Sequence, residues 1–126
     1  MGETSTPPRL KRVKATREGL VGQRTASGFI IDEHVPFVAL PSIKALYLAV
    51  RVRNPANGES CAAIVLDVGP WNTHDDAYVF GAARPAAESG VDQWQRATNG
   101  AGIDLSERVW RVLRMADNTD VEWEFV

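Results

Sequence analysis

The stretch LAVRVRNPANGESCAAIVLDVGPW, residues 48–71, decides the fold of this 126-residue chain. Its first part alternates, because the apolar Val50 and Val52 are each followed by an arginine. A period of two sends successive side chains to opposite faces of an extended segment, which is the pattern of a half-buried β-strand. We therefore expect a strand with one face on an apolar core and the other in water.

A hairpin should follow this strand. Asn57-Gly58 supplies the positive backbone angles that a tight bend between antiparallel strands requires. Residues 60–66, SCAAIVL, are then apolar on both faces, which suits a strand buried inside a barrel. The single cysteine, Cys61, lies in this strand, so we expect a small buried core residue and no internal disulfide.

The rest of the chain predicts further short strands and one helix. Residues 35–40 are apolar and end at a proline, and residues 121–126 alternate apolar side chains with two glutamates. Between them an apolar helical stripe begins near Leu105, with Asp104 or Ser106 as the capping residue. Short strands, a short helix and many turns indicate a small β-barrel.

Two segments lack such periodicity. Residues 1–18 are polar and basic and offer almost nothing to bury, so we expect a disordered arm, followed by the barrel domain over residues 19–126. Residues 68–102 contain turn dipeptides and no sustained repeat, which predicts a long inserted loop. A loop of this length in a small domain is more often functional than not.

Composition limits the class of function. A hydrophobic fraction of 44% suits an ordinary core, and the length fits one domain. The net charge of −2 argues against a nucleic-acid partner. No apolar run approaches the roughly 20 residues that span a bilayer. Residues 1–18 also lack the apolar stretch of a secretory signal, so we expect either a cytoplasmic protein or an exported one whose signal has been removed.

Three motifs stand in a suggestive order: the Asn-Gly hairpin at 57–58, DVGP at 67–70 and IDLS at 103–106. Together they resemble the rare lipoprotein A group of double-psi β-barrels, and expansins and barrel-type lytic transglycosylases look like more distant relatives. The similarity covers residues 20–126. It implies an all-β fold, a six-stranded double-psi β-barrel with one or two short helices and a long inserted loop. That loop resembles the one in a subgroup of uncharacterised bacterial proteins.

The resemblance implies a groove that binds a glycan chain. In rare lipoprotein A the substrate is peptidoglycan, cleaved by lytic transglycosylation, whereas expansins loosen wall polysaccharide without hydrolysis. The two motif aspartates map onto Asp67 and Asp104, and a threonine in a Gly-x-x-Thr pattern maps onto Thr25. The same resemblance implies a periplasmic or extracellular location, while a cytoplasmic one stays open. The oligomeric state is left open as well.

Two departures from the family leave other functions open. The family's histidine three residues before Leu-Pro is Phe37 here, and its arginine after the first aspartate is Val68. Both changes remove a polar group from the expected site. The alternatives are therefore a non-catalytic, expansin-like polysaccharide-binding module, or a barrel that uses its long loop to contact another protein.

Asp67 is the expected acid/base. It ends an apolar strand, so its carboxyl should be partly desolvated at the barrel mouth, and desolvation raises a carboxyl pKa as a general acid requires. The alternative is a purely structural role, in which the carboxylate only accepts backbone hydrogen bonds at the strand end. Asp104 is either a second site carboxylate or a helix N-cap.

Aromatic residues are candidates for stacking on sugar rings. Trp71 is the best situated, just beyond the first aspartate, although it could instead cover the end of the barrel. Trp94 lies in a polar loop, where exposure or ligand contact is expected, and Tyr78 in the same loop is a further substrate-binding candidate. Trp110 and Trp123 fall in periodic segments that predict core positions.

No metal and no cofactor are expected. His74-Asp75-Asp76 lacks the further ligands at the spacing of a zinc site. No glycine-rich phosphate loop stands out either.

Overall fold

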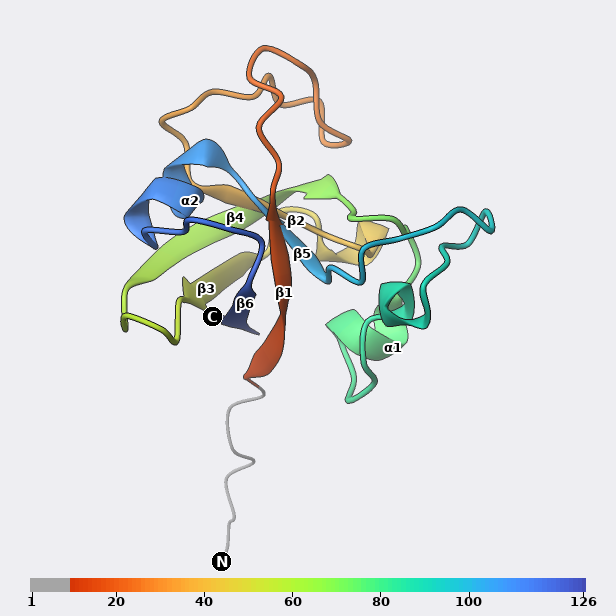
Figure 1. Ribbon diagram of the computed structural model, residues 1–126. Coiled ribbons are helices and arrows are strands. Elements are labelled where there is room, and N and C mark those ends of the chain that lie inside the picture. Colours follow the sequence, from red (N-terminus) through yellow and green to blue (C-terminus); the bar gives the residue numbers. More distant parts are fainter. Residues whose placement is uncertain (1–9) are drawn as a thin grey trace, which may run out of the picture.

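The computed structural model describes residues 10–126, whose six strands close into one barrel in the order β1-β5-β2-β4-β3-β6 (Figure 1). The strands are β1 (Lys11–Arg17), β2 (Phe37–Leu40), β3 (Ala49–Arg53), β4 (Ser60–Val68), β5 (Ile103–Leu105) and β6 (Asp120–Phe125). The two short α-helices are α1 (Asp76–Val79) and α2 (Glu107–Val112). The predicted all-β barrel with six strands, short helices and a long inserted loop is therefore confirmed.

Both kinds of strand pairing occur in the barrel. β1 with β5 and β2 with β4 are parallel, and the other four pairs are antiparallel. The predicted hairpin joins β3 to β4, with Val52 opposite Cys61, and Gly58 in its bend has a φ of 79°. Such positive angles are the reason that glycine is favoured there.

The expectation of a disordered arm over residues 1–18 is wrong for residues 10–18, while residues 1–9 lie outside the described part. Lys11–Arg17 forms β1, which pairs with both β5 and β6. Val13 and Ala15 alternate into the core with 1% and 0% of their surface exposed. The barrel domain therefore begins eight residues earlier than residue 19, at the start of β1.

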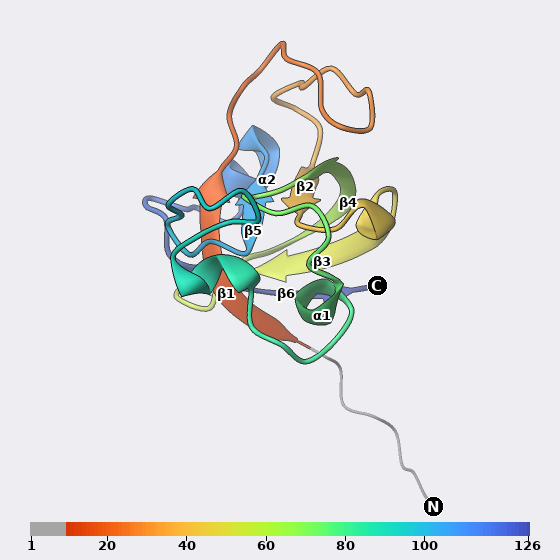
Figure 2. The ribbon, with the colours of Figure 1, turned by 90° about the vertical axis from the view of Figure 1, so that its right-hand side faces the viewer.

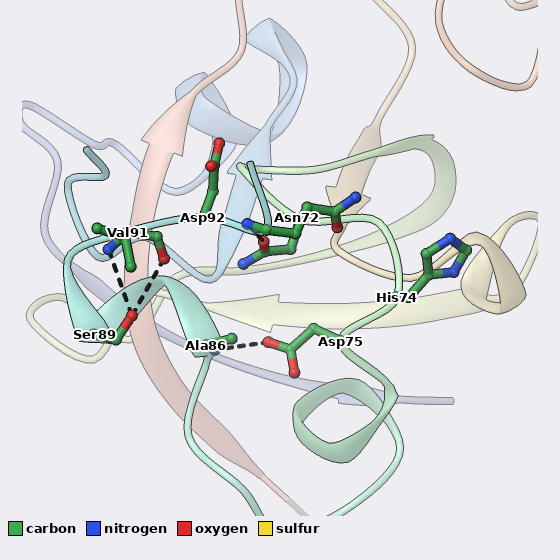
Figure 3. A pocket seen from close by; sticks show the side chains of 8 residues that line it. Asn72, His74, Asp75, Ala86, Ser89, Val91 and Asp92 are labelled. Atoms are coloured by element: carbon green, nitrogen blue, oxygen red, sulfur yellow. Dashed lines mark hydrogen bonds between the residues drawn. The ribbon is translucent and has the colours of Figure 1, made fainter. Parts of the chain in front are cut away.

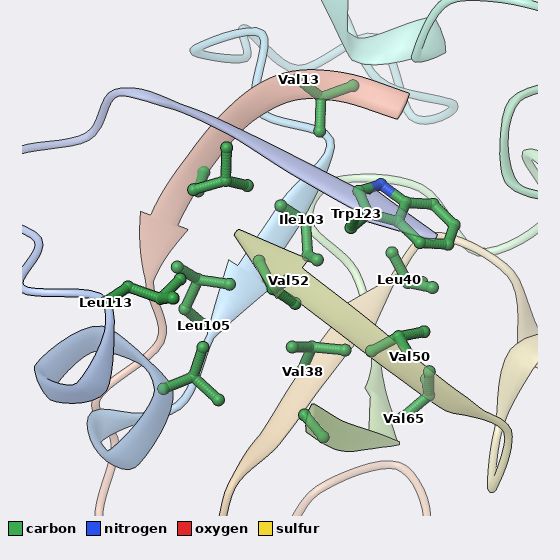
Figure 4. Close-up of a cluster of buried hydrophobic side chains, with 14 of the residues drawn as sticks. Val13, Val38, Leu40, Val50, Val52, Val65, Ile103, Leu105, Leu113 and Trp123 are labelled. Atoms are coloured by element: carbon green, nitrogen blue, oxygen red, sulfur yellow. The ribbon is translucent and has the colours of Figure 1, made fainter. Parts of the chain in front are cut away.

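The barrel interior is filled mainly by aliphatic side chains around one tryptophan (Figure 4). The cluster includes Val13, Val38, Leu40, Val50, Val52, Val65, Ile103, Leu105, Leu113 and Trp123. Burial of each large side chain stabilises the fold by about 1.5–3 kcal/mol, so this cluster holds the sheet closed. Trp110 and Trp123 are buried as predicted. Cys61 is only half-buried and packs against the cluster, so the prediction of a small buried core residue is wrong.

Ser106 is the N-cap of α2, because its hydroxyl accepts a hydrogen bond from the N–H of Val109 at 3.3 Å. Asp104, the other capping candidate, lies instead inside β5. This difference frees the Asp104 carboxyl from a purely local role.

Two long connections flank the barrel. Residues 18–36 leave the end of β1 and project beyond the sheet (Figure 1). Residues 68–102, the predicted loop, run along one side of the barrel and contain α1 (Figure 2). This loop is attached to β1, because Arg84 donates to the carbonyl of Arg12 and Lys14 donates to that of Asn99, both at 3.0 Å. Among residues 10–126, no helix is long and apolar enough to cross a membrane.

Candidate functional site

A row of aligned residues crosses the outer face of four neighbouring strands. Thr16 of β1 pairs with Asp104 of β5, Asp104 with Ala39 of β2, and Ala39 with Asp67 of β4. The chain neighbours of Asp104 on both sides are in the core, so its own side chain points outward. Two inter-strand spacings of about 4.8 Å separate the two aspartates, which therefore share one face at a Cα distance of about 10 Å.

A β-bulge turns Asp67 to this face. Val38 pairs with Val65, but the next residue, Ala39, pairs with Asp67, so Leu66 is an extra residue in β4. Residues two apart in a regular strand share a face. In a regular strand of the same length, without the bulge, Asp67 would share the core face with Val65.

The outer position of Asp67 is fixed by two backbone hydrogen bonds. Its Oδ1 accepts from the N–H of Ala26 at 2.9 Å and from the N–H of Val68 at 2.8 Å. Ala26 belongs to the projecting 18–36 segment, which is thereby tied to the sheet. Oδ1 is fully used, and Oδ2 is the oxygen left for other chemistry.

The pKa of Asp104 is raised to about 6, and burial is the largest cause. The hydroxyl of Thr16 donates to Oδ1 and offsets part of this rise, while the charge of Asp67 adds to it. Sequence reasoning missed Thr16 because it lies in the basic stretch that was expected to be disordered. The signal that could have revealed it is the alternation of Val13 and Ala15 next to it.

Glu18 is a third carboxyl at this site, and sequence reasoning missed it for the same reason. Both of its carboxyl oxygens are buried, and neither has a hydrogen-bond partner among the described residues. The pKa of Glu18 is raised to about 9, first by burial, then by Asp67 as a hydrogen-bond acceptor and a charge, and last by the charge of Asp104. Asp67 is therefore near enough to raise the pKa of Glu18, although the geometry between the two carboxyls is not that of a regular hydrogen bond. At neutral pH Glu18 is protonated.

Two predicted substrate-binding residues are buried. Thr25 is buried, and its hydroxyl lies 2.9 Å from that of Ser27. Tyr78 is only 1% exposed; its hydroxyl donates to the carbonyl of Gly102 at 2.9 Å and accepts from the indole N–H of Trp123 at 2.8 Å. A substrate-binding role for Tyr78 is therefore wrong, because its ring belongs to the core.

The two loop tryptophans remain accessible. Trp71 follows Asp67 by four residues, past the cis Gly69-Pro70 bond, and it is partly exposed. Its indole N–H donates to Oδ1 of Asn99 at 2.9 Å, which fixes the ring. Trp94 is 54% exposed as expected, and the guanidinium of Arg96 lies 4.7 Å from its ring centre.

A separate cavity of about 480 Å³ opens in the 68–102 loop (Figure 3). Asn72, His74, Asp75 and Asp92 are among the residues that line it. None of the lining residues is one of the three acids on the outer face of the sheet, Glu18, Asp67 and Asp104, which we call the carboxyl row. Asp75 accepts from the N–H of Ala86 at 2.7 Å, so this carboxylate is already used in holding the loop. Within residues 10–126, no three or more His, Cys, Asp or Glu side chains are placed so that they could hold a metal ion.

One of the comparisons with known proteins bears on the architecture. No curated protein sequence matches the chain. Among solved structures, the Streptomyces papain inhibitor is similar with a TM-score of 0.56 and 18% identity, over 97% of this chain and 99% of that one. At such identity the likeness shows a shared small-barrel fold alone, and membership of the rare lipoprotein A or expansin groups is not shown. Residues 9–124 match a domain of unknown function, DUF8814, and the chain belongs to that family.

Proposed function

We propose that this domain acts on a cell-wall glycan, with peptidoglycan as substrate, in the manner of a lytic transglycosylase that uses Asp67 as acid/base. The observation that carries the proposal is the gathering of Asp67, Asp104 and Glu18 on one face, with raised pKa values for the last two. Burial of an acid without a cation beside it destabilises a protein, so such an arrangement is found mainly where function requires it. Groups with perturbed pKa values accordingly cluster at functional sites.

One acid/base suffices for this reaction, because the substrate supplies its own nucleophile. A proton passes from the acid to the oxygen of the leaving sugar while the bond from that oxygen to the anomeric carbon of the muramic ring breaks. The 6-hydroxyl of the same ring attacks that carbon and returns its proton to the carboxylate. Asp67 Oδ2 suits both transfers, since Oδ1 is engaged by two N–H groups. Trp71, partly exposed and close in the chain, offers a flat face for a sugar ring.

Digestion of purified sacculi tests the proposal. The wild type should release 1,6-anhydromuropeptides, and Asp67→Asn should slow their release by about 100-fold or more. The asparagine keeps Oδ1 as acceptor for the N–H groups of Ala26 and Val68, so the fold should persist. Asp117→Asn, at an exposed turn, is the matched control. Unchanged release by Asp67→Asn rejects the acid/base role, and binding of sacculi by the wild type without any product favours the expansin-like binding module instead.

A second candidate function is contact with another protein, and the projecting 18–36 segment favours it. Its apolar residues Leu20, Val21 and Ile30 are 53%, 54% and 47% exposed. Apolar side chains gathered on an exposed segment are typical of interaction sites. The structural similarity to a papain inhibitor makes a papain-type cysteine protease the first partner to test.

Inhibition of papain itself separates the two candidates. If the second function holds, the wild type inhibits papain, Val21→Asp abolishes inhibition, and Val91→Asp in the 68–102 loop does not. Val91 is a suitable control because it is also exposed, at 43%. Wild-type protein that leaves papain fully active removes this candidate.

A further inference from the structure

The carboxyl of Glu18 is the least compensated polar group within the described residues. It is the one side chain there whose buried oxygens have no hydrogen-bond partner. Buried polar groups in native proteins are nearly always paired, and an exception calls for an explanation in terms of function, water or an ion. Among residues 10–126, no group of three or more potential metal ligands is placed to hold an ion, so a bound ion does not explain the missing partner of Glu18.

The backbone holds Glu18 firmly at this site. Its N–H donates to the carbonyl of Leu105 at 2.9 Å, which extends the β1–β5 ladder beyond Arg17. Thr16, two residues earlier, faces Asp104. Since residues two apart on a strand share a face, Glu18 belongs to the same outer row as the two aspartates.

The charges that act on Glu18 are both acidic. They are Asp67 on β4 and Asp104 on β5. The adjacent cation, Arg17, is bound to Glu107 through two hydrogen bonds of 2.6 Å. A third negative charge would therefore meet two others in a buried setting, and the carboxyl keeps its proton instead.

We propose that Glu18 is the proton store of Asp67, the group from which Asp67 is loaded before it meets a substrate oxygen. Asp67 Oδ1 is occupied by two N–H groups, so Oδ2 must both receive the proton and pass it on. The O–H bond of Glu18 breaks as an O–H bond forms on Asp67 Oδ2, and the leaving sugar oxygen then takes this proton from Oδ2, which leaves both carboxyls ionised. The proton of the attacking hydroxyl returns by the same path, so the pair carries one proton before and after.

This role rests on the proposed function, and it makes Glu18 a positioning residue rather than a catalytic one. Its oxygens are enclosed, so they act through Asp67 and do not touch the substrate. The sequence resemblance implies an acid/base role for Asp67 and no role for Glu18. A proton held by Glu18 extends that role to a pair of carboxyls.

Carboxyl titration by carbon-13 NMR on the full chain tests the pair without any substrate. Glu18 should titrate far above the ordinary range of glutamate, and Asp67→Asn should lower its midpoint, because the variant removes the neighbouring charge. Asp117→Asn should leave the midpoint unchanged. A Glu18 midpoint in the ordinary range, or one that does not respond to Asp67→Asn, overturns the proposal.

Sacculus digestion by Glu18→Gln gives a second, kinetic test. Glutamine matches the shape of the protonated acid but has no proton to give, so kcat should fall at least tenfold while KM stays unchanged. The alkaline limb of the wild-type pH profile should also disappear. Glu59→Gln, at an exposed hairpin position, is the control. A wild-type rate and pH profile in Glu18→Gln overturn the proposal, whereas a wild type that releases nothing refutes the proposed function and leaves the NMR titration to decide the pair.

Discussion

Two acids of the 68–102 loop have cations or hydrogen-bond donors beside them that lower their pKa, whereas Asp104 and Glu18 of the carboxyl row have other acids beside them that raise it. In the loop, Asp76 accepts from the hydroxyl of Ser42 and lies 3.1 Å from the ammonium of Lys44, and both contacts lower its pKa. Burial raises the pKa of Asp92, but hydrogen bonds from the backbone and guanidinium of Arg96 outweigh it and lower the pKa overall.

On the outer face of the sheet the balance is reversed. Asp104 meets one hydroxyl and another acid, and Glu18 meets two acids. Loop acids with cations and N–H donors hold a chain segment in position, whereas Asp104 and Glu18, which have no cation beside them, favour the protonated form. Sequence alone shows the two groups as equivalent aspartates and glutamates, and only the partners distinguish them.

The largest expected effect is the pH dependence that Glu18 imposes on stability. Its pKa of about 9 in the fold exceeds the ordinary 4.5, so the stability it contributes is complete below about pH 4.5 and is lost as the pH rises through 9. The upper limit is about 6 kcal/mol, and the partial exposure of the residue reduces this to a few kcal/mol. Urea unfolding at pH 7 and pH 9.5, both above the window in which Asp104 titrates, should show the loss in the wild type and not in Glu18→Gln. An equal loss in both proteins would break the contrast between row and loop.

A smaller effect is expected at Asp104. Its pKa is raised from 3.8 to about 6, so the folded protein loses stability as the pH rises through that window. Asp104→Asn keeps Oδ1 as the acceptor for Thr16 and should be about 1–3 kcal/mol more stable than the wild type at pH 8, with no difference at pH 3.5. Denaturant titrations at both pH values measure this. Destabilisation at pH 8 would mean that the ionised carboxylate holds the sheet together.

The opposite sign is expected in the loop. Asp92→Ala leaves the N–H groups of Trp94 and Arg96 without their acceptor and should lower Tm by about 5 °C or more. Because the pKa of Asp92 is lowered, its contribution is present at neutral pH and disappears as the pH falls through the folded value. Thermal unfolding followed by circular dichroism checks both points, with Asp117→Ala as control. A variant as stable as the wild type would mean that Asp92 does not stabilise the loop, and that the contrast with the row acids does not hold.

The smallest effect concerns Trp71, which lies at the start of the 68–102 loop, four residues after Asp67 of the row. Trp71→Ala should weaken binding of soluble peptidoglycan fragments about tenfold, equivalent to 1.4 kcal/mol. NMR titration measures the affinity, and Trp94→Ala tests whether the exposed loop tryptophan shares the binding. A loss seen only in Trp94→Ala would move the glycan site from the row to the loop.

The barrel could be predicted where the pattern was strong. Alternation at Val50 and Val52, with the glycine in the bend, was sufficient for the β3–β4 hairpin. The same alternation exists at Val13 and Ala15, but the basic residues between and around them concealed a central strand. Tyr78 was misassigned because it stands in an aperiodic segment, and tertiary packing buries such residues without any local periodicity.

The candidate site could be predicted only in part. The motifs identified Asp67 and Asp104, and the register brings them to one face. Thr16 and Glu18 belong to the misread strand, so no motif indicated them. The hydrogen bond from Ala26 to Asp67 joins residues 41 positions apart, and a contact of that range follows from the closed topology rather than from local pattern.

The extra residue at Leu66 has a consequence for how such domains diverge. In a regular strand successive side chains alternate between the two faces, so Asp67 would share the core face with Val65 if β4 kept its length and lost the bulge. Loss of the codon for Leu66 would instead remove the bulge and keep the aspartate opposite Ala39 on the outer face. Relatives of this protein can therefore differ in strand length and keep the same site, or keep the same length and lose it, while an alignment of their sequences would still show the aspartate.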